Sequence, residues 1–316
     1  MKLGQLYNLD SLESLVSQKT QFNDSVAGAV LARNLTHIDP KILEKKYPEL
    51  VLVNSGIEVD NSGGYSRKIQ SLRLRDIGGF STAGDVSGNR GKISLAAEDS
   101  YLTVIERESH SNWSDSEINQ AATQGINLPQ RYISAHNQAY LREVDQIGLV
   151  GLDAAGGGLL NNNYFTSTTA SGSIASLTGK QAYDEFAELI TSQWNSVNNT
   201  PEYKAMRVIT TVETLNSLQT KILGTTAESG RSVLAALQLN FPGVTFTASF
   251  RANQDGQPSY TAVYSDSADV MKMRIPLALR FSNIYEKGFS FTIDSKYRIA
   301  GLDILEPAGG RILRGL

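Results

Sequence analysis

The chain contains no cysteine among its 316 residues. This absence excludes disulfides, thiolate nucleophiles and cysteine-ligated zinc together. Histidine is also scarce, because only His37, His110 and His136 occur, with no His-x3-His or His-Glu-x-x-His spacing. The sequence therefore predicts no metal site. We expect His136, which lies beside the apolar stripe of a predicted helix, to be a hydrogen-bonded structural residue.

Strong net charge and long hydrophobic runs are missing as well. The formal net charge is only −3, so no basic field attracts nucleic acid or acidic lipid. No window approaches the roughly 18 to 20 apolar residues of a membrane span, and the first residues lack the apolar core of a secretory signal. We expect no membrane partner and a chain that is made without a targeting segment. Its 41% hydrophobic content is ordinary for one large or two moderate globular domains.

Nucleotide-binding and catalytic motifs are absent too. The stretch Glu143–Asn162 ends an apolar run in Ala-Ala-Gly-Gly-Gly, which invites comparison with phosphate-binding loops. A Walker A loop needs a lysine after its second glycine, and no lysine follows here. A Rossmann fingerprint needs a third glycine that opens a helix, which is also missing. No Gly-x-Ser-x-Gly elbow or distinctive carboxylate pair occurs, so we expect neither catalytic residues nor cofactors.

The predicted organisation begins with a polar segment, residues 1–50. Its helical periodicity is weak, and it is read either as an arm that gains order from neighbouring molecules or as an ordinary helical subdomain. Residues 51–110 follow with strand alternation on both sides of a glycine-rich tip, residues 78–91. This pattern predicts a long hairpin that is too polar to be core.

Opposite charges are separated on the two sides of this hairpin. An isolated two-stranded hairpin is marginally stable in water, which favours contact with another subunit over a purely solvated hairpin. The candidate contact residues are Arg67, Lys68, Arg73 and Arg75 on the outgoing side, and Glu98, Asp99, Glu106 and Glu108 on the return side.

Helical signals dominate the next segment. Ser114 and Glu117 form a capping-box sequence that predicts a helix to about Gly125, and Asn127-Leu-Pro-Gln130 predicts the start of a longer one. A second capping box at Thr178–Gln181 and a cap formed by Thr210 with Glu213 predict two further helices. A third helix is predicted at 232–237. Strands are predicted at 205–210, 244–250, 275–281, 289–293 and 297–299.

In its order of elements, the chain resembles the major capsid proteins of tailed double-stranded DNA bacteriophages with the Hong Kong 97 type fold. The resemblance centres on a long helix (130–147), an apolar strand (148–152), a glycine-rich turn (154–158) and a Leu-Leu-Asn run (159–161). It implies an α+β fold with an N-terminal arm, an extended β-hairpin loop, a peripheral domain with a long spine helix, and an axial α/β domain. The corresponding boundaries are 1–50, 51–110, 111–158, 159–272 and, for a β-rich return, 273–316.

The same resemblance implies a structural role in the virion. The subunit would assemble with itself, as hexamers and pentamers, into an icosahedral shell in the bacterial cytoplasm. A separate scaffolding protein and a portal are the implied partners, a decoration protein is a further candidate, and packaged DNA would be held without sequence-specific binding. Some family members crosslink through a lysine and an asparagine. Lys68 lies in the matching loop, but no asparagine matches, so a crosslink is not assigned.

The glycine triplet, Gly156, Gly157 and Gly158, is interpreted as a domain-junction turn that uses positive φ values. Two alternatives to the phage capsid stay open at this point. One is an encapsulin-type nanocompartment shell, which shares the fold and encloses an enzyme. The other is an enzyme with a scattered acid/base site, which a pocket with convergent carboxylates in a stable monomer would support.

Overall fold

The computed structural model describes residues 50–52, 55–79, 92–123, 125–152, 156–224, 230–253 and 259–316. The predicted N-terminal arm, except for its last residue, and most of the predicted hairpin tip lie outside these residues. Within the described part, no helix is long and apolar enough to cross a membrane.

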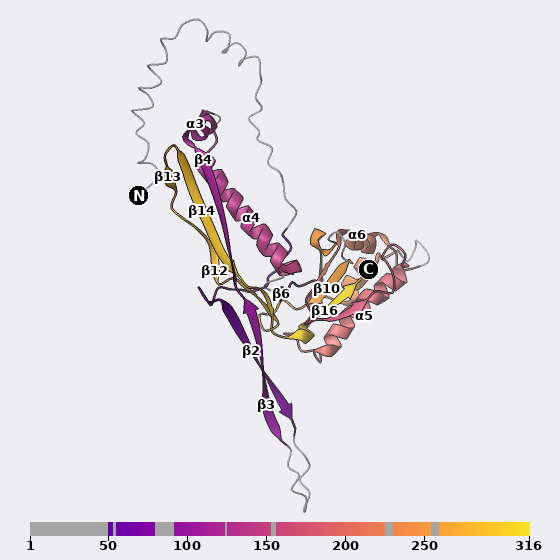
Figure 1. Ribbon diagram of the computed structural model, residues 1–316. Helices are drawn as coiled ribbons and strands as arrows, with labels where there is room; N and C mark the ends of the chain where they lie inside the picture. The colour runs from indigo at the N-terminus through magenta and orange to yellow at the C-terminus, as the bar shows by residue number, and fades with distance from the viewer. Residues whose placement is uncertain are drawn as a thin grey trace, which may run out of the picture. The chain divides into compact units, whose positions relative to one another are not determined.

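The longest helix is α4, Leu128–Val150 (Figure 1). Its start is as predicted, because the Asn127 side chain accepts a hydrogen bond from the Gln130 N–H and a proline occupies the first turn. Its end is later than predicted. Residues 148–150, expected to be strand, continue the buried face of the helix, and only Gly151–Leu152 (β5) are extended. The helix ends at Gly151, where φ is +85°.

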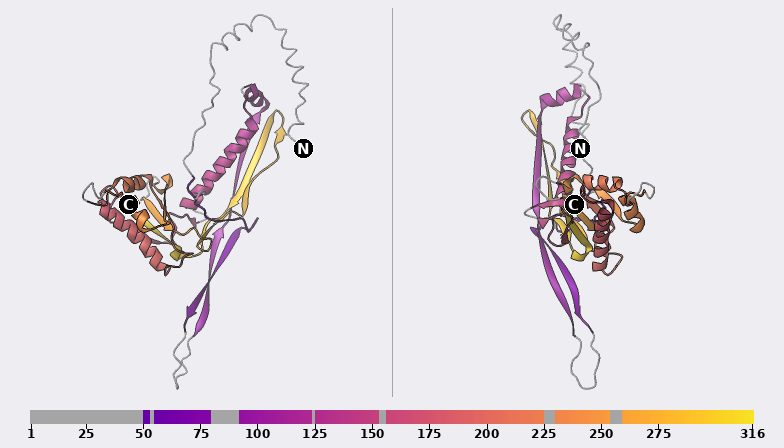
Figure 2. Two further views of the ribbon diagram at one scale, coloured as in Figure 1. Left: turned by 180° about the vertical axis from the view of Figure 1, so that it is seen from behind. Right: turned by 90° about the vertical axis from the view of Figure 1, so that its right-hand side faces the viewer.

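A long antiparallel sheet packs on α4. Strand β4 (Ile105–Ser114) pairs along its whole length with β14 (Ser290–Ile299), and β12 (Leu277–Phe281) and β13 (Tyr285–Lys287) pair with the other side of β14. The two strands predicted at 289–293 and 297–299 are thus one strand. Trp113 of β4 stacks on Tyr132 of α4 with ring centroids 5.0 Å apart. The side view in Figure 2 shows α4 along this sheet.

Helix α3 (Asp115–Thr123) follows β4 directly. The predicted capping box is present, since the Glu117 N–H donates to Ser114 Oγ and the Ser114 N–H donates to the Glu117 carboxylate. These bonds satisfy two backbone donors that the first turn of a helix leaves without partners.

The second half of the chain builds a five-stranded sheet in the order β7–β16–β10–β8–β9, with bounds Thr166–Thr169, Gly310–Arg314, Tyr260–Tyr264, Arg207–Thr210 and Thr245–Ala248. Helices α5 (Gly179–Ser196), α6 (Val212–Thr220) and α7 (Val233–Asn240) share a core with it. Both the Thr178–Gln181 capping box and the helix after Ser232 are as predicted.

Two local predictions in this part are wrong. Thr211, not Thr210, caps α6, because Thr210 is the last residue of β8 and its side chain bonds to Thr261 inside the sheet. Strand β9 ends at Ala248, and a short 3₁₀ helix, η4 (Phe250–Ala252), follows. Ser249 caps this helix, because its side chain accepts the Arg251 N–H.

A small sheet joins these parts, with β11 (Met271–Arg274) between β1 (Val59–Asp60) and β15 (Gly301–Ile304). One hydrophobic core lies between α4 and the sheets, and a second lies under α5, α6 and α7. A short 3₁₀ helix, η5 (Pro307–Gly309), precedes β16. The remaining strands are the hairpin β2 (Lys68–Gly78) and β3 (Ile93–Thr103), and the short pair β5 and β6 (Gly156–Gly157).

Candidate assembly surfaces

The hairpin has two distinct faces. Strands β2 and β3 form a sheet of their own, in which Leu72 lies opposite Asp99 and Arg73 opposite Glu98. Because side chains alternate along a strand, Leu72 lies on one face of the ribbon and Arg73 on the other. Paired residues share a face, so Leu95 and Tyr101 of β3 lie on the Leu72 face.

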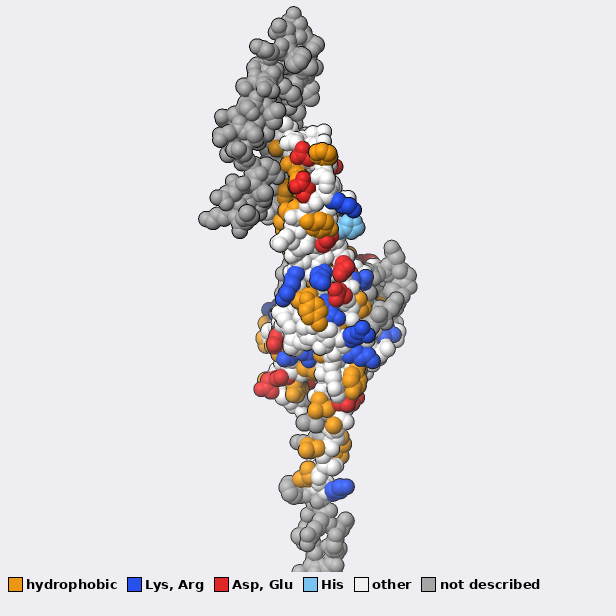
Figure 3. Space-filling model, turned by 60° about the vertical axis from the view of Figure 1, so that its left-hand side comes forward, with side chains coloured by type: hydrophobic (Ala, Val, Ile, Leu, Met, Phe, Trp, Pro, Cys, Tyr) orange, Lys and Arg blue, Asp and Glu red, His pale blue; other side chains and the backbone are white. Residues whose placement is uncertain are grey.

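The Leu72 face exposes four large apolar side chains among charged ones such as Asp99. Leu72, Ile93, Leu95 and Tyr101 retain 59%, 57%, 71% and 59% of their accessible surface. We call these four residues the hairpin apolar face. Figure 3 shows hydrophobic side chains exposed along the hairpin on the side in view. An exposed apolar surface of this kind, repeated along one ribbon, indicates a protein–protein contact.

The other face is fastened to the rest of the chain at the hairpin root. Ser71 is buried, and its hydroxyl donates to the carboxylate of Asp303, which is 2% exposed. Arg274 bonds to Asp303 at 3.0 Å, to Ser71 at 3.3 Å and also to Asp60. One guanidinium thus joins β11, β15, β1 and β2, which fixes the root of the hairpin.

Arg73, predicted to be a contact between subunits, is used within its own chain. Its guanidinium donates to the carbonyl of Ile304 and lies 5.6 Å from the centre of the Tyr164 ring. This hydrogen bond is a second connection between β2 and β15, two residues along β2 from Ser71. Arg73 therefore helps to fix the hairpin root.

The other predicted contact residues fall into two groups. Arg67, Lys68, Glu98 and Asp99 are exposed on the hairpin, and Arg75 lies on β2 opposite Ala96. Glu106 and Glu108 lie instead on β4, which pairs with β14. Glu106 forms ion pairs with Arg298 and Lys296 across that sheet. The chain changes partner strand at Val104, and the sequence carries no turn signal there that could have revealed it.

Glycine is needed at positions 156–158 for a different reason from the predicted one. Gly157 and Gly158 do not have positive φ; the nearby positive φ belongs to Gly151. Gly151 and Gly157 instead pair as the ends of a small hairpin, β5–β6. A Cβ on Gly158 would lie 2.5 Å from the backbone nitrogens of Val150 and Gly151. The glycine at position 158 is therefore needed because the backbone at the end of α4 lies close to it.

The Leu-Leu-Asn run completes this turn. The N–H groups of Leu159 and Leu160 donate to the carbonyls of Gly148 and Leu149 at 2.8 and 2.9 Å, and both leucine side chains are buried. Within the run, the Asn161 amide oxygen accepts the Gly158 N–H at 2.8 Å, and that of the next residue, Asn162, accepts the Phe165 N–H at 2.7 Å. These bonds return the chain along the last turn of α4 before it enters β7, so the motif is a structural support.

A buried carboxylate on α4 secures the segment that leads to the hairpin. The Asp145 side chain is 1% exposed, accepts the Leu52 N–H at 2.8 Å and pairs with Arg251 of η4 at 3.2 Å. The Leu52 side chain packs against Gly148, where any Cβ would overlap it. Sequence reasoning missed Asp145 because both partners are about 100 residues away in the chain.

His136 is the structural histidine that the sequence predicted. It is 7% exposed, and its two ring nitrogens lie 2.8 Å from the Ser111 hydroxyl and 2.7 Å from the Ser295 hydroxyl. These bonds connect α4 to β4 and β14. Burial lowers the pKa of His136 below its usual value of 6.5, and the nearby His110 lowers that pKa further.

We expect the folded subunit to lose stability in acid through His136. The unfolded chain binds a proton first as the pH falls, so this contribution is complete above pH 6.5 and is lost below it. As the pH falls below about 6.5, the free energy of unfolding should fall by at most about 1.4 kcal/mol per pH unit from this residue. Urea titrations of the unassembled subunit measure this slope. His136→Gln should have a smaller slope than the wild type, and equal slopes would contradict the assignment.

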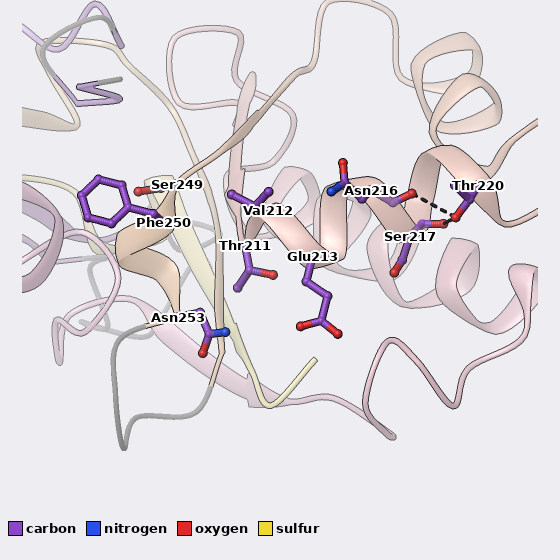
Figure 4. A pocket seen from close by; sticks show the side chains of 9 residues that line it. All are labelled: Thr211, Val212, Glu213, Asn216, Ser217, Thr220, Ser249, Phe250 and Asn253. Atoms are coloured by element: carbon purple, nitrogen blue, oxygen red, sulfur yellow. Dashed lines mark hydrogen bonds between the residues drawn. The ribbon is translucent and has the colours of Figure 1, made fainter. Parts of the chain in front are cut away.

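A groove of about 580 Å³ runs along the exposed side of α6 (Figure 4). Glu213, Asn216 and Ser217 line it on the helix, and Phe250 and Asn253 of the η4 segment line the other side. Glu213 is the only ionisable residue among the described residues that line the groove. In the described part of the chain, no three His, Asp or Glu side chains are grouped to hold a metal ion.

Comparisons with known proteins identify the family of the chain. A family model described as major capsid protein matches residues 91–313. The capsid of Myoviridae phage XM1 is similar, with 38% identity, a TM-score of 0.80, and coverage of 90% of this chain and 98% of that chain. No curated protein matches the chain.

More distant structures share the fold. The capsid of a native GTA particle has a TM-score of 0.67 at 12% identity, covering 93% of this chain and 99% of that chain. The structure from Mycobacterium phage Che8 has a TM-score of 0.61 at 16% identity, covering 88% of this chain and 96% of that chain.

The fold is therefore the α+β fold of Hong Kong 97 type capsid proteins, as the sequence predicted. The chain belongs to the major capsid protein family. Members of this family are structural components of the virion that associate with copies of themselves into a shell, and they are not enzymes. The alternative of an enzyme with a scattered acid/base site is thus excluded.

Proposed function

We propose that this chain forms the icosahedral head of a tailed bacteriophage around double-stranded DNA, and that the hairpin apolar face packs on a neighbouring copy. The observation that carries this contact is the exposure of Leu72, Leu95 and Tyr101 on one face of a ribbon whose root is fastened by Ser71 and Arg73. A fixed root holds the apolar face in place, which reduces the entropy that is lost when the contact forms.

The charges at the hairpin root would add specificity to this contact. Arg67, Lys68, Glu98 and Asp99 have no ion-pair partner among the described residues. We propose that they pair with opposite charges on the neighbour, where complementary charges select the register of the contact more than its strength. Arg75 is proposed for the same role.

The proposed contents and partners follow from the capsid role. A net charge of −3 suits a container that must not bind its DNA tightly, because basic linings hold phosphates in a salt-dependent manner. The similarity to the phage XM1 capsid favours a phage head over a nanocompartment. A separate scaffolding protein, a portal and hexamers and pentamers of this chain belong to the proposal, and a decoration protein is a further candidate partner.

Electron microscopy of the purified chain, alone and after expression with the product of the neighbouring upstream gene, tests this function. We expect closed shells in at least one of the two samples. Shells that form only with the neighbour would support a separate scaffolding protein. Small particles of uniform size in both samples, at every protein concentration tried, would contradict the proposed function.

A further inference from the structure

The groove along α6 has an exposed apolar side chain on each of its two walls. Val212, at the start of α6, retains 48% of its accessible surface, and Phe250 of η4 retains 43%. Figure 4 shows these two side chains on separate segments of the chain. Apolar residues that are exposed singly need no explanation, but two that line one groove of about 580 Å³ indicate a binding surface.

Three polar side chains in the same lining are free to bind a ligand. Glu213 and Asn216 of α6 and Asn253 after η4 are exposed, and their side chains have no hydrogen bond or ion pair with any described residue. The carboxylate of Glu213 makes the groove acidic. An asparagine amide offers a donor and an acceptor together, which match the C=O and N–H groups of another polypeptide backbone.

Both walls of the groove are held in place by contacts inside the chain. On the α6 wall, the buried Thr211 hydroxyl accepts the N–H of the buried Thr214 at 3.0 Å. On the η4 wall, Arg251 lies 4.9 Å from the centre of the Phe250 ring and pairs with the buried Asp145 of α4 at 3.2 Å. Fixed walls lower the ordering cost of a contact that forms between them.

The length of the groove suits a short extended segment. Its lining residues on α6 run from Val212 to Thr220, which is about 12 Å along the helix axis and the length of about four extended residues. An extended segment leaves its backbone N–H and C=O groups free to bond to the two asparagines, whereas a helix uses these groups internally.

We infer that this groove binds an extended segment of a partner protein, in which a lysine or arginine is two residues from an apolar residue. This spacing places both side chains on the same face of the segment, toward the groove. The basic side chain pairs with Glu213, and the apolar one packs between Val212 and Phe250. Asn216 and Asn253 bond to the backbone of the segment.

All of these groove residues belong to one subunit. The site therefore goes beyond the proposed shell-forming function and does not depend on it. It is also separate from the hairpin apolar face, which lies on β2 and β3.

Two short peptides test the predicted charge preference. One is acetylated and amidated Val-Thr-Lys-Thr-Val, whose β-branched residues favour an extended chain, and the other has glutamate in place of lysine. Fluorescence anisotropy of labelled peptide, titrated with the unassembled subunit, measures binding. We expect the lysine peptide to bind at least about fivefold more tightly, because Glu213 attracts lysine and repels glutamate. Equal affinities, or no binding of the lysine peptide at the highest subunit concentration, would overturn the inference.

Variants of the groove locate the site. Glu213→Gln keeps the size of the side chain and should remove the preference for the lysine peptide. Glu188→Gln makes the same change at an exposed position of α5 outside the groove, and should retain the preference. Asn216→Ala should weaken both peptides alike, because it removes a bond to the backbone. Urea unfolding verifies that each variant is folded. A lysine preference that survives in Glu213→Gln would show that the groove is not the site.

The same variants distinguish a partner protein from a second copy of this chain. We expect Glu213→Gln and Asn216→Ala to form shells at the wild-type protein concentration, measured by light scattering. A raised concentration for shell formation together with unchanged peptide binding would mean that another copy covers the groove, and the assignment to a partner protein would then be wrong.

Discussion

Leu95→Lys is expected to prevent shell formation while leaving the subunit folded. The substitution removes the most exposed leucine of the hairpin apolar face and forces a lysine into the contact. Loss of one buried leucine costs about 1.5–3 kcal/mol at each contact, which corresponds to roughly 10- to 150-fold in contact affinity. The contacts recur across a closed shell, so the loss multiplies. Sedimentation velocity and electron microscopy measure the assembled fraction.

Lysine is chosen because the hairpin itself tolerates it. Position 95 lies opposite Asp76 in the strand register, and position 72, where Leu72→Lys would serve as a second variant, lies opposite Asp99. Opposite charges across a strand pair are favourable, so the hairpin should keep its structure. Ser94→Lys places the same charge on the other face and is the matched control. Equal assembly of Leu95→Lys and the wild type would rule out the apolar contact.

Gly158→Ala is expected to have the largest effect on folding. Its new methyl group would lie 2.5 Å from the backbone nitrogens of Val150 and Gly151, and backbone atoms at the end of a helix cannot move aside as a flexible side chain can. Forcing an extra carbon into a well-packed site costs about 1–3 kcal/mol, and we expect a value at or above the upper end here. Urea unfolding of the unassembled subunit measures the change.

Gly79→Ala is the control for the general effect of replacing glycine. A Cβ at Gly79 meets no atom of the described residues within 4 Å, and this residue does not have positive φ. We expect its unfolding free energy to stay within about 1 kcal/mol of the wild type. If Gly158→Ala is as stable as Gly79→Ala, close packing is not the reason for glycine at position 158.

Local sequence signals predicted the elements well. Ser114, Asn127, Thr178 and Ser232 each begin a helix as predicted, because a capping side chain acts on backbone groups within three residues. Strand alternation likewise predicted β2, and the helical spacing of apolar residues predicted the buried stripe of α4, which includes Val144 and Ile147. These features depend on neighbours in the sequence, which is why one sequence suffices.

Features made by distant residues could not be predicted in the same way. The ties of Ser71 to Asp303 and of Leu52 to Asp145 join residues 232 and 93 positions apart. Charge in the sequence drew attention to Arg73, Glu106 and Glu108, yet each of these lies where its own chain supplies a neighbouring strand or partner. The hairpin apolar face became visible only when the register placed Leu95 and Tyr101 beside Leu72.

The absence of cysteine allows a direct test of the hairpin contact. Leu95→Cys would carry the only thiol in the chain, and its reaction with a small maleimide can be timed in unassembled subunits and in shells. We predict rapid labelling of the subunit and at least tenfold slower labelling of the shell, because the apolar contact excludes water and reagent. Equal labelling rates in both states would contradict the claim that the hairpin apolar face is buried between copies.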